Sequence, residues 1–191
     1  MKKIIIAIDS FKGCLTSAEA GKAAEKGIKS INPSCHTSVI PIADGGEGLL
    51  DVLITATKGK YITLSAHGPL MKMAKTHYGL SGNGRTAIIE MAAISGLPLV
   101  PIEQRNPMLT TTFGTGELIK DALNKGCRNF IIGIGGSATN DAGLGMLQAL
   151  GFRFLDKSGH TLGTGGQIME AVANIDTSCL LYTSPSPRDT E

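Results

Sequence analysis

Four short blocks of the chain combine glycine with charged or hydroxyl side chains. In the first block, DSFKG at residues 9–13, Asp9 offers a cation ligand or a proton acceptor, and Lys12 offers a partner for a phosphate or a carboxylate. Gly13 would let the backbone approach a ligand closely. The alternative is that Asp9 only caps the following helix, and these five residues leave both interpretations open.

The second block, ADGGEG at residues 43–48, carries two carboxylates among three glycines. Backbone N–H groups of Gly45 and Gly46 at the start of a helix would favour an anion, and Asp44 and Glu47 could hold Mg²⁺ against that anion. A glycine-rich turn with capping acids is the alternative. Local composition does not decide between a binding loop and a turn.

The third block, residues 110–117, is a run of threonines and glycines that leads directly into a predicted helix. Hydroxyl and amide donors such as those of Thr115 and Gly116 suit a phosphate or a substrate carboxylate. Threonine also caps helices in most proteins, so binding and capping are equally compatible with this block.

The fourth block, residues 133–141, follows a predicted buried strand and precedes a helix, which is the setting of a phosphate-binding loop. Residues 133–138 also satisfy the G-x-G-x-x-A pattern of a dinucleotide loop, with Asp156 following the next strand, so an NAD-dependent oxidoreductase is the rival hypothesis. The extra Gly136 and the polar run that ends in Asp141 disfavour that rival. The sequence lacks the P-loop and protein-kinase motifs.

The elements that must position these blocks follow from the hydrophobic pattern. The apolar run at residues 3–8 predicts a central strand that is buried on both faces of a parallel sheet. Alternating stretches between residues 61 and 91 predict an antiparallel meander. Further strands are predicted over residues 37–42, 129–134 and 152–155, and helices over residues 18–30, 48–56, 115–124 and 141–150. The chain is therefore expected to be an α/β protein.

Composition excludes several classes of protein. The formal charge is only +2, and lysine and arginine are dispersed, so we expect no nucleic-acid partner. Asp9 and Lys12 interrupt the first apolar run long before the ~20 apolar residues of a membrane span, so we expect a cytoplasmic protein without a membrane partner. The four cysteines are far apart, which favours unpaired thiols in a reduced compartment.

In this order, the blocks resemble the glycerate kinase family, type 1. The resemblance extends from Met1 to about Asp176, with small departures such as Ile8, where the family usually has proline. It leaves out only residues 178–191, which we expect to be a non-native tail. The segments that carry it are DSFKG, ADGGEG, GPL at residues 68–70, IEMAAISGLPLVP at 89–101, RNP at 105–107, TTFGTGELI at 111–119 and GIGGSATNDAG at 133–143.

The resemblance implies two α/β domains around a cleft. Residues 1–60 would supply the N-terminal part of a Rossmann-like parallel-sheet domain, and residues 61–177 would supply part of an inserted mixed α/β domain that contains the meander. Members of the family are about twice as long as this chain. We therefore expect an N-terminal fragment that is inactive alone, and we leave a homodimer open.

The resemblance also implies a reaction, in which the γ-phosphoryl group of ATP moves to D-glycerate with Mg²⁺ present, giving 2-phosphoglycerate. We assign Asp9, Lys12 and Asp141 to catalysis and Asp44 and Glu47 to the metal. Cofactor-binding candidates are Ser10, Gly45, Gly46, Gly135, Gly136 and Ser137, and the substrate-binding candidates are Arg105, Thr115 and Gly116. Glu90 and the four histidines are isolated polar residues for which we expect structural roles.

Overall fold

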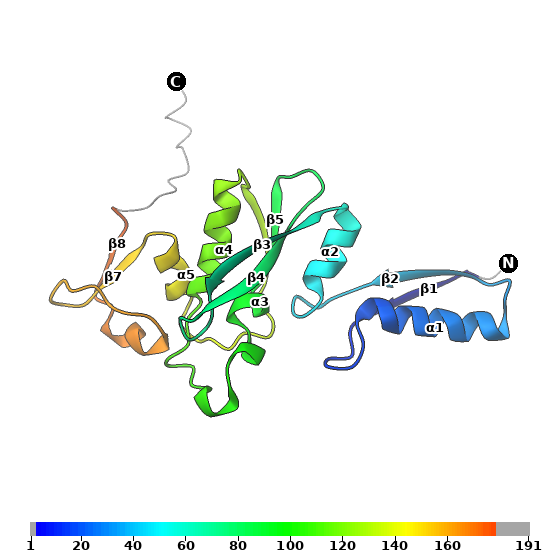
Figure 1. Ribbon diagram of the computed structural model, residues 1–191, viewed down its shortest axis with the longest axis horizontal. Coiled ribbons are helices and arrows are strands. Elements are labelled where there is room, and N and C mark those ends of the chain that lie inside the picture. Colours follow the sequence, from blue (N-terminus) through cyan, green and yellow to red (C-terminus); the bar gives the residue numbers. More distant parts are fainter. Residues whose placement is uncertain (1–2, 179–191) are drawn as a thin grey trace, which may run out of the picture. The chain divides into compact units, whose positions relative to one another are not determined.

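The computed structural model describes residues 3–178 of this α/β protein (Figure 1). It opens with the predicted β-α-β unit, formed by β1 (Lys3–Ile8), α1 (Ser17–Ile31) and β2 (His36–Pro41). The two strands are parallel, with Lys3 opposite His36 and Ile8 opposite Pro41. Apart from Ser178, the predicted tail lies outside the described residues.

Helix α1 begins with a capping box. Thr16 Oγ1 accepts a hydrogen bond from the Glu19 backbone N–H at 3.2 Å, and the Thr16 N–H donates to Glu19 Oε2 at 2.9 Å. These two bonds satisfy donors that the first turn would otherwise leave free. Thr16 therefore caps α1, and the helix ends at Ile31, with Asn32 as its C-cap residue directly before Pro33.

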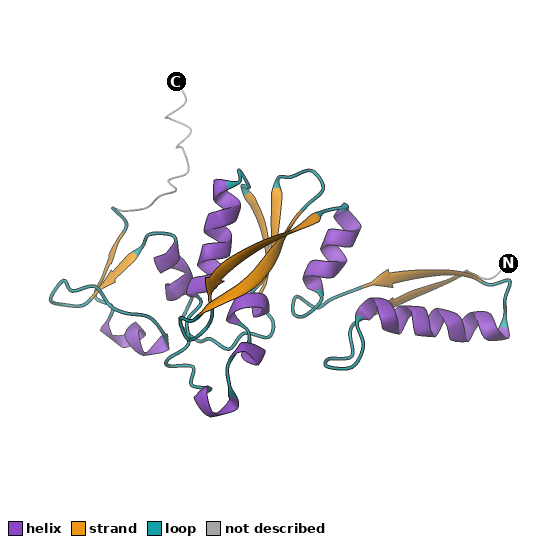
Figure 2. Cartoon of the chain, in the orientation of Figure 1, coloured by secondary structure: helices purple, strands orange, loops and turns teal. Residues whose placement is uncertain are grey.

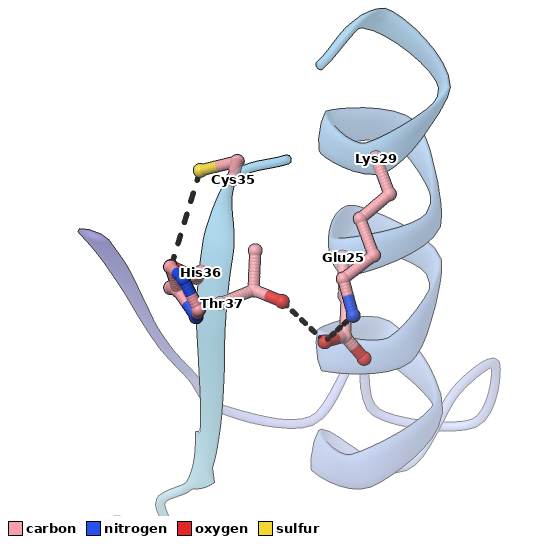
Figure 3. A network of polar contacts seen from close by, with 5 residues as sticks. All are labelled: Glu25, Lys29, Cys35, His36 and Thr37. Atoms are coloured by element: carbon pink, nitrogen blue, oxygen red, sulfur yellow. Dashed lines mark hydrogen bonds and ion pairs between the residues drawn. The ribbon is translucent and has the colours of Figure 1, made fainter. Parts of the chain in front are cut away.

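The face of α1 that meets β2 carries a polar link as well as apolar contacts (Figure 3). Thr37 Oγ1 on β2 donates to the Glu25 carboxylate, which also pairs with Lys29 Nζ at 2.9 Å. Two hydrogen bonds lower the pKa of Glu25. The bond from Thr37 has the larger effect, and the bond from Lys29 has the smaller one. The helix is thus held to the second strand of the unit by a carboxylate shared between two donors.

The prediction that β1 is a central strand buried on both faces is wrong for the described residues. Ile5 is 59% exposed and Ile4 is 36% exposed, and Ile6 alone among the residues of β1 is buried. Within residues 3–178, β1 pairs only with β2, so its second edge has no partner there. An apolar β-branched run specifies a strand, but whether both its faces are covered depends on elements far away in the sequence.

Helix α2 (Leu49–Thr57) follows the second glycine-rich block, one residue later than predicted. Its N-cap residue, Gly48, has a left-handed φ of 89° and offers no side-chain cap. Leu50 and Ile54 face inward and belong to one cluster with Ile88. Burial of this apolar face fixes the helix against strand β5 (Thr86–Glu90).

A four-stranded sheet has the order β3-β4-β5-β6 (Figures 1 and 2). Its other members are β3 (Lys60–His67), β4 (Met73–Leu80) and β6 (Asn129–Gly133). Strands β4 and β5 are antiparallel, as the turn signals predicted, whereas β5 and β6 are parallel and align Glu90 with Gly133. This parallel pair sets the ends of two strands, and the loops that follow them, at one edge of the sheet.

The remaining elements include the α-helices α4 (Phe113–Asn124) and α5 (Leu144–Ala149), which pack on each other. Strands β7 (Arg153–Leu155) and β8 (Asn174–Asp176) form an antiparallel pair. The short helices are α3 (Ala92–Ser95), η1 (Leu97–Leu99), η2 (Ile102–Gln104) and η3 (Gly166–Ala171).

Helix α5 begins three residues later than the predicted start at Asp141. Ala142 and Gly143 have left-handed φ values of 50° and 75°, which an α-helix does not accommodate. Asp141 is therefore placed before the helix, where its side chain accepts bonds from the N–H groups of Gly143 and Gly145. Helix propensity alone did not reveal this cap.

The chain divides into two compact units, and none of the helices among residues 3–178 is long and apolar enough to cross a membrane. The first unit contains the residues up to Ile62, Tyr78–Ala92 and Arg128–Gly136. The second contains Thr63–His77, Ala93–Cys127 and the residues from Ser137 onward. The predicted domains at 1–60 and 61–177 refer to a longer protein, and they stay a prediction.

Gly114→Ala should destabilise the protein strongly. A Cβ atom at Gly114 would overlap the carbonyl oxygen of His67 and lie 2.7 Å from Ile94 Cγ1, so the first turn of α4 would have to move. We expect a loss of about 2–3 kcal/mol in the free energy of unfolding, measured by urea denaturation. In the matched control, Gly27→Ala on α1, the new Cβ meets nothing within 4 Å, and a gain of about 0.5–1 kcal/mol is expected. Equal effects of the two substitutions would contradict the close approach of α4 and β3.

Candidate functional site

The second and fourth glycine-rich blocks meet in the first unit. The Gly135 N–H donates to Gly45 O at 3.1 Å, and a Cβ at Gly135 would lie 2.6 Å from the Cα of Gly46. A Cβ at Gly133 would lie 2.5 Å from Gly45 O. The two loops therefore touch through their backbones, and this approach is open only to residues without side chains.

Several of the predicted phosphate-binding amides already have partners in this contact. The Gly46 N–H donates to Asp44 Oδ1 at 3.0 Å, which makes a tight turn, and the Gly135 N–H bonds Gly45. Gly136 is exposed and has a left-handed φ of 74°. Contact of these amides with ATP stays a prediction, and any ligand at Gly46 or Gly135 would have to share or replace the bonds seen here.

Carboxylates gather around the start of α2. Asp44, Glu47 and Asp51 are exposed, and Glu90 at the end of β5 is half-buried. Glu90 Oε2 accepts from the Leu50 N–H at 3.3 Å, so it supplies the cap that Gly48 lacks. Burial raises the pKa of Glu90, hydrogen bonds from the N–H groups of Leu50 and Gly48 partly offset the rise, and nearby Asp51 and Glu47 add to it.

Glu90 was expected to be an isolated structural residue, and its contact with the second block was not foreseen. A signal was present, because Glu90 directly follows the buried run Ala87–Ile89, and acids at strand ends in parallel sheets face the binding edge. Its register opposite Gly133 places it beside the fourth block as well.

The two predicted metal ligands, Asp44 and Glu47, lie on the exposed loop before α2. No group of three or more histidine, cysteine, aspartate or glutamate side chains within residues 3–178 is arranged to hold a metal ion. Mg²⁺ is commonly held by one or two carboxylates together with water and substrate phosphates. Two exposed carboxylates fit that mode of binding, and the metal site stays a prediction.

The first block forms a tight loop beside α2. The Leu15 and Cys14 N–H groups both donate to Phe11 O, at 3.0 and 2.7 Å, and Gly13 has a left-handed φ of 74°. The Ser10 N–H donates to Asp9 Oδ1 at 2.6 Å, and Lys12 is exposed. A cavity of about 540 Å³ lies here, with Ser10, Phe11 and Gly13 on one side and Glu47, Gly48 and Asp51 on the other. The first two blocks are thus brought to one cavity within the first unit.

In the second unit, a buried carboxylate joins the third and fourth blocks. Asp141 is 1% exposed, and its oxygens accept from Thr111 Oγ1 at 3.1 Å and from the Thr112 N–H and hydroxyl at 2.8 and 3.0 Å. They also accept from the N–H groups of Gly143 and Gly145, at 3.1 and 3.2 Å. One side chain therefore caps the start of α5 and anchors Thr111 and Thr112, the two residues that precede α4.

This arrangement leaves little of the third block for a ligand. Thr115 is 0% exposed, its hydroxyl lies 2.8 Å from Ser95 Oγ, and a Cβ at Gly116 would overlap Met146 O. The bond to Ser95 of α3 accounts for Thr115, packing of α4 on α5 accounts for Gly116, and the five donors around Asp141 account for its oxygens. The burial of Asp141, Thr115 and Gly116 favours structural roles, and direct contact of the three with substrate stays a prediction.

Arg105 lies in a second cavity, which belongs wholly to the second unit. This cavity has a volume of about 260 Å³ and is lined by Leu97, Val100, Arg105, Asn106, Pro107, Ser137, Ala138 and Thr139. Arg105 Nε donates to Val100 O at 3.2 Å, and the hydroxyl oxygens of Ser137 and Thr139 are 2.7 Å apart. We call this cavity the Arg105 recess. Sequence reasoning named Arg105 and Ser137 but gave them to different ligands.

Comparison with known proteins identifies the family. The family model described as "Glycerate kinase family" matches residues 4–184, which include all four blocks. The chain belongs to the glycerate kinase family. It is 54% identical over 178 residues to a glycerate kinase of Bacillus subtilis and 49% identical to a glycerate 2-kinase of Escherichia coli, covering 93% of this chain and 47% of each relative.

A solved structure agrees with this membership. The putative glycerate kinase 2 from Salmonella typhimurium LT2 is 48% identical, with a TM-score of 0.81 over 94% of this chain and 49% of that one. The chain therefore spans about half the length of the relatives it matches. The comparisons support the glycerate kinase resemblance and lend no support to the NAD-dependent rival.

Asp141→Ala should cost much stability, because it removes the acceptor of five buried donors. We expect the free energy of unfolding to fall by about 3 kcal/mol or more. As a control, Asp121→Ala removes a partly exposed carboxylate that pairs with Lys125 at 2.6 Å, and a change within about 1 kcal/mol is expected. Denaturant titration measures both, and a similar small loss for Asp141→Ala would show that the cap is dispensable.

Glu90 should give stability a dependence on pH. Its pKa is raised in the folded state above the ordinary value of 4.5, so its contribution is fully present below that value. The contribution is lost as the pH rises through the raised pKa. Glu90→Gln keeps an acceptor for the Leu50 N–H but does not titrate, so its unfolding free energy should decline less over this range. Parallel curves for the two proteins would contradict the assignment.

Proposed function

We propose that the protein to which this chain belongs transfers the γ-phosphoryl group of ATP to D-glycerate and forms 2-phosphoglycerate. The match of residues 4–184 to the glycerate kinase family carries the proposal. The printed name of the Escherichia coli relative, a glycerate 2-kinase, supports the 2-phosphate as product. The contact of the two glycine-rich blocks adds a physical argument, because closely packed glycine backbones at strand ends suit phosphate groups.

The first unit supplies the groups that we assign to the nucleotide. Gly45, Gly46, Gly135 and Gly136 line the meeting of the two loops, and Ser10 lines the adjacent cavity. Asp44 and Glu47 are the carboxylates that would hold Mg²⁺, which when bound offsets the charge of the phosphates.

Lys12 and Asp9 carry the chemical roles that we assign within the first block. The exposed Lys12 ammonium group would stabilise the negative charge that develops on the transferred group. Asp9 would orient the acceptor hydroxyl or accept its proton through the oxygen that does not bond Ser10. Phosphoryl transfer demands mainly alignment and charge stabilisation, so these two side chains suffice for the chemistry assigned to them.

The second unit supplies the groups that we assign to glycerate. The Arg105 guanidinium group matches the two oxygens of a carboxylate. Thr115, Gly116 and Asp141 would act indirectly, by fixing the helices behind the site. Inactivity of the 191-residue chain alone, a cytoplasmic location and a homodimer stay parts of the proposal.

Lys12→Ala should lower turnover by about a hundredfold or more and leave the fold intact, since Lys12 is exposed. The assay is coupled ADP release, with the gene completed to the length of its relatives. Lys22→Ala, which removes an equally exposed lysine from α1, is the matched control and should keep normal turnover. Near-normal turnover of the Lys12 variant would remove this residue from the mechanism.

Phosphorus NMR of the product tests the reaction itself. A phosphate on the 2-hydroxyl group of D-glycerate is the expected product, and consumption of ATP without a phosphoglycerate signal would contradict the proposal. Fluorescence titration with NADH tests the rival, because its enhancement without binding of ATP would restore the oxidoreductase hypothesis.

A further inference from the structure

We propose that the Arg105 recess is the binding site for the carboxylate end of the acceptor, and that the side chain of Ser137 contacts the acceptor and not the nucleotide. The inference rests on the proposed function for the identity of the acceptor as a short hydroxy acid. It revises the assignment of Ser137, which sequence reasoning gave to the phosphates of ATP.

The charge of the recess favours an anion. Arg105 is the only charged residue in its lining, and no aspartate or glutamate is among the lining residues. Arg105 Nε is engaged with Val100 O, while its terminal nitrogens have no hydrogen-bond partner within residues 3–178. An exposed guanidinium group held by its inner nitrogen presents its outer nitrogens as a fork for two carboxylate oxygens.

The hydroxyl groups of Ser137 and Thr139 line the recess together with Arg105, and one of their two hydrogens is available to a ligand. Ser137 Oγ accepts from the Thr139 N–H at 3.0 Å and shares a second hydrogen bond with Thr139 Oγ1 at 2.7 Å. Two hydroxyl groups carry two hydrogens, and their mutual bond uses one of them. The other hydrogen can be donated to a carboxylate oxygen or to the 2-hydroxyl group of the acceptor.

The size of the recess favours the acceptor over the nucleotide. Its volume is about 260 Å³. Pockets for drug-sized ligands run from about 300 to 1,000 Å³, so this recess suits a three-carbon acid and is too small for a whole nucleoside triphosphate. Leu97, Val100, Pro107 and Ala138 supply apolar walls, which can contact the carbon atoms of the acid.

The recess is formed within the second unit. The Ala138 N–H donates to Ser95 O at 2.9 Å, and Gly96 and Ser137 form an antiparallel bridge. Thr110 Oγ1 donates to Ala138 O at 2.8 Å from the other side. Ser137, Ala138 and Thr139 are therefore fixed before a ligand arrives, and the site requires no group from the first unit.

Titration of the 191-residue chain with D-glycerate, followed by amide NMR and calorimetry, tests the proposal. D-glycerate should shift the amide signals of the non-proline residues within 97–107 and those of residues 137–139, and glycerol, which lacks the carboxylate, should not. Arg105→Met should raise the Kd for D-glycerate by about tenfold or more, and Ser137→Ala should raise it by about threefold. Arg85→Met, which removes an exposed arginine of the first unit, should leave it unchanged.

Titrations with ATP and with inorganic phosphate test whether the recess binds a phosphate group instead of a carboxylate. ATP should not shift the amides of the recess, and phosphate should compete with D-glycerate only weakly. Shifts of the recess by ATP that Arg105→Met abolishes would overturn the proposal, as would equal binding of glycerol or the lack of any binding at millimolar D-glycerate.

The failure of this inference can be told apart from failure of the proposed function. If the completed protein phosphorylates D-glycerate and Arg105→Met does not change the KM, the recess is not the acceptor site, but the kinase proposal stands. If D-glycerate binds in the recess but no phosphoryl transfer occurs, the kinase proposal is wrong and the assignment of the recess stands.

Discussion

The segment from Gly133 to Asp141 imposes the constraint on which both candidate sites depend. At its start, Gly133 and Gly135 touch the backbone of the second block so closely that a side chain at either position would overlap it. At its end, the Asp141 carboxylate is buried and must find donors, because an unpaired buried charge is costly. It finds them at the starts of two helices. Ser137 and Thr139, the two hydroxyl-bearing residues of the Arg105 recess, lie between these two fixed ends.

Local signals in the sequence were sufficient for most of the elements. The capping box at Thr16, the turn residues before β5 and the apolar runs of β1 and β6 each depend on neighbours within a few positions. The start of α5 was missed because Asp141 is not a local cap alone. Its partners Thr111 and Thr112 lie about thirty residues earlier in the chain. Ala142 has a left-handed φ, but alanine is not a residue type that predicts a break before a helix. The exposure of Ile5 likewise depends on which distant elements cover β1.

The sequence was sufficient to identify the four blocks of the candidate site, but not to predict which of their residues contact one another. Composition identified hydroxyl groups in the third block, yet nothing in that block shows whether a threonine faces a ligand or the interior. The structure turns Thr110, Thr111, Thr112 and Thr115 inward, where each bonds a protein group. Conversely, Arg105 and Ser137 are separated by 32 positions, and only the fold shows that they line one recess.

The charges of the two candidate sites differ in a way that suits the two substrates that we propose. In the first unit, Asp44, Glu47, Asp51 and Glu90 lie near the start of α2. Burial raises the pKa of Glu90, and the nearby carboxylates of Asp51 and Glu47 add to the rise. Such a cluster would repel the phosphates of a nucleotide, and a divalent cation would offset part of its negative charge. In the second unit, the Arg105 recess contains no acid in its lining, so a carboxylate can be bound there by the protein alone. Under the proposed function, we therefore expect the nucleotide groups to need a metal ion and the carboxylate site to need none, because of where the acids lie.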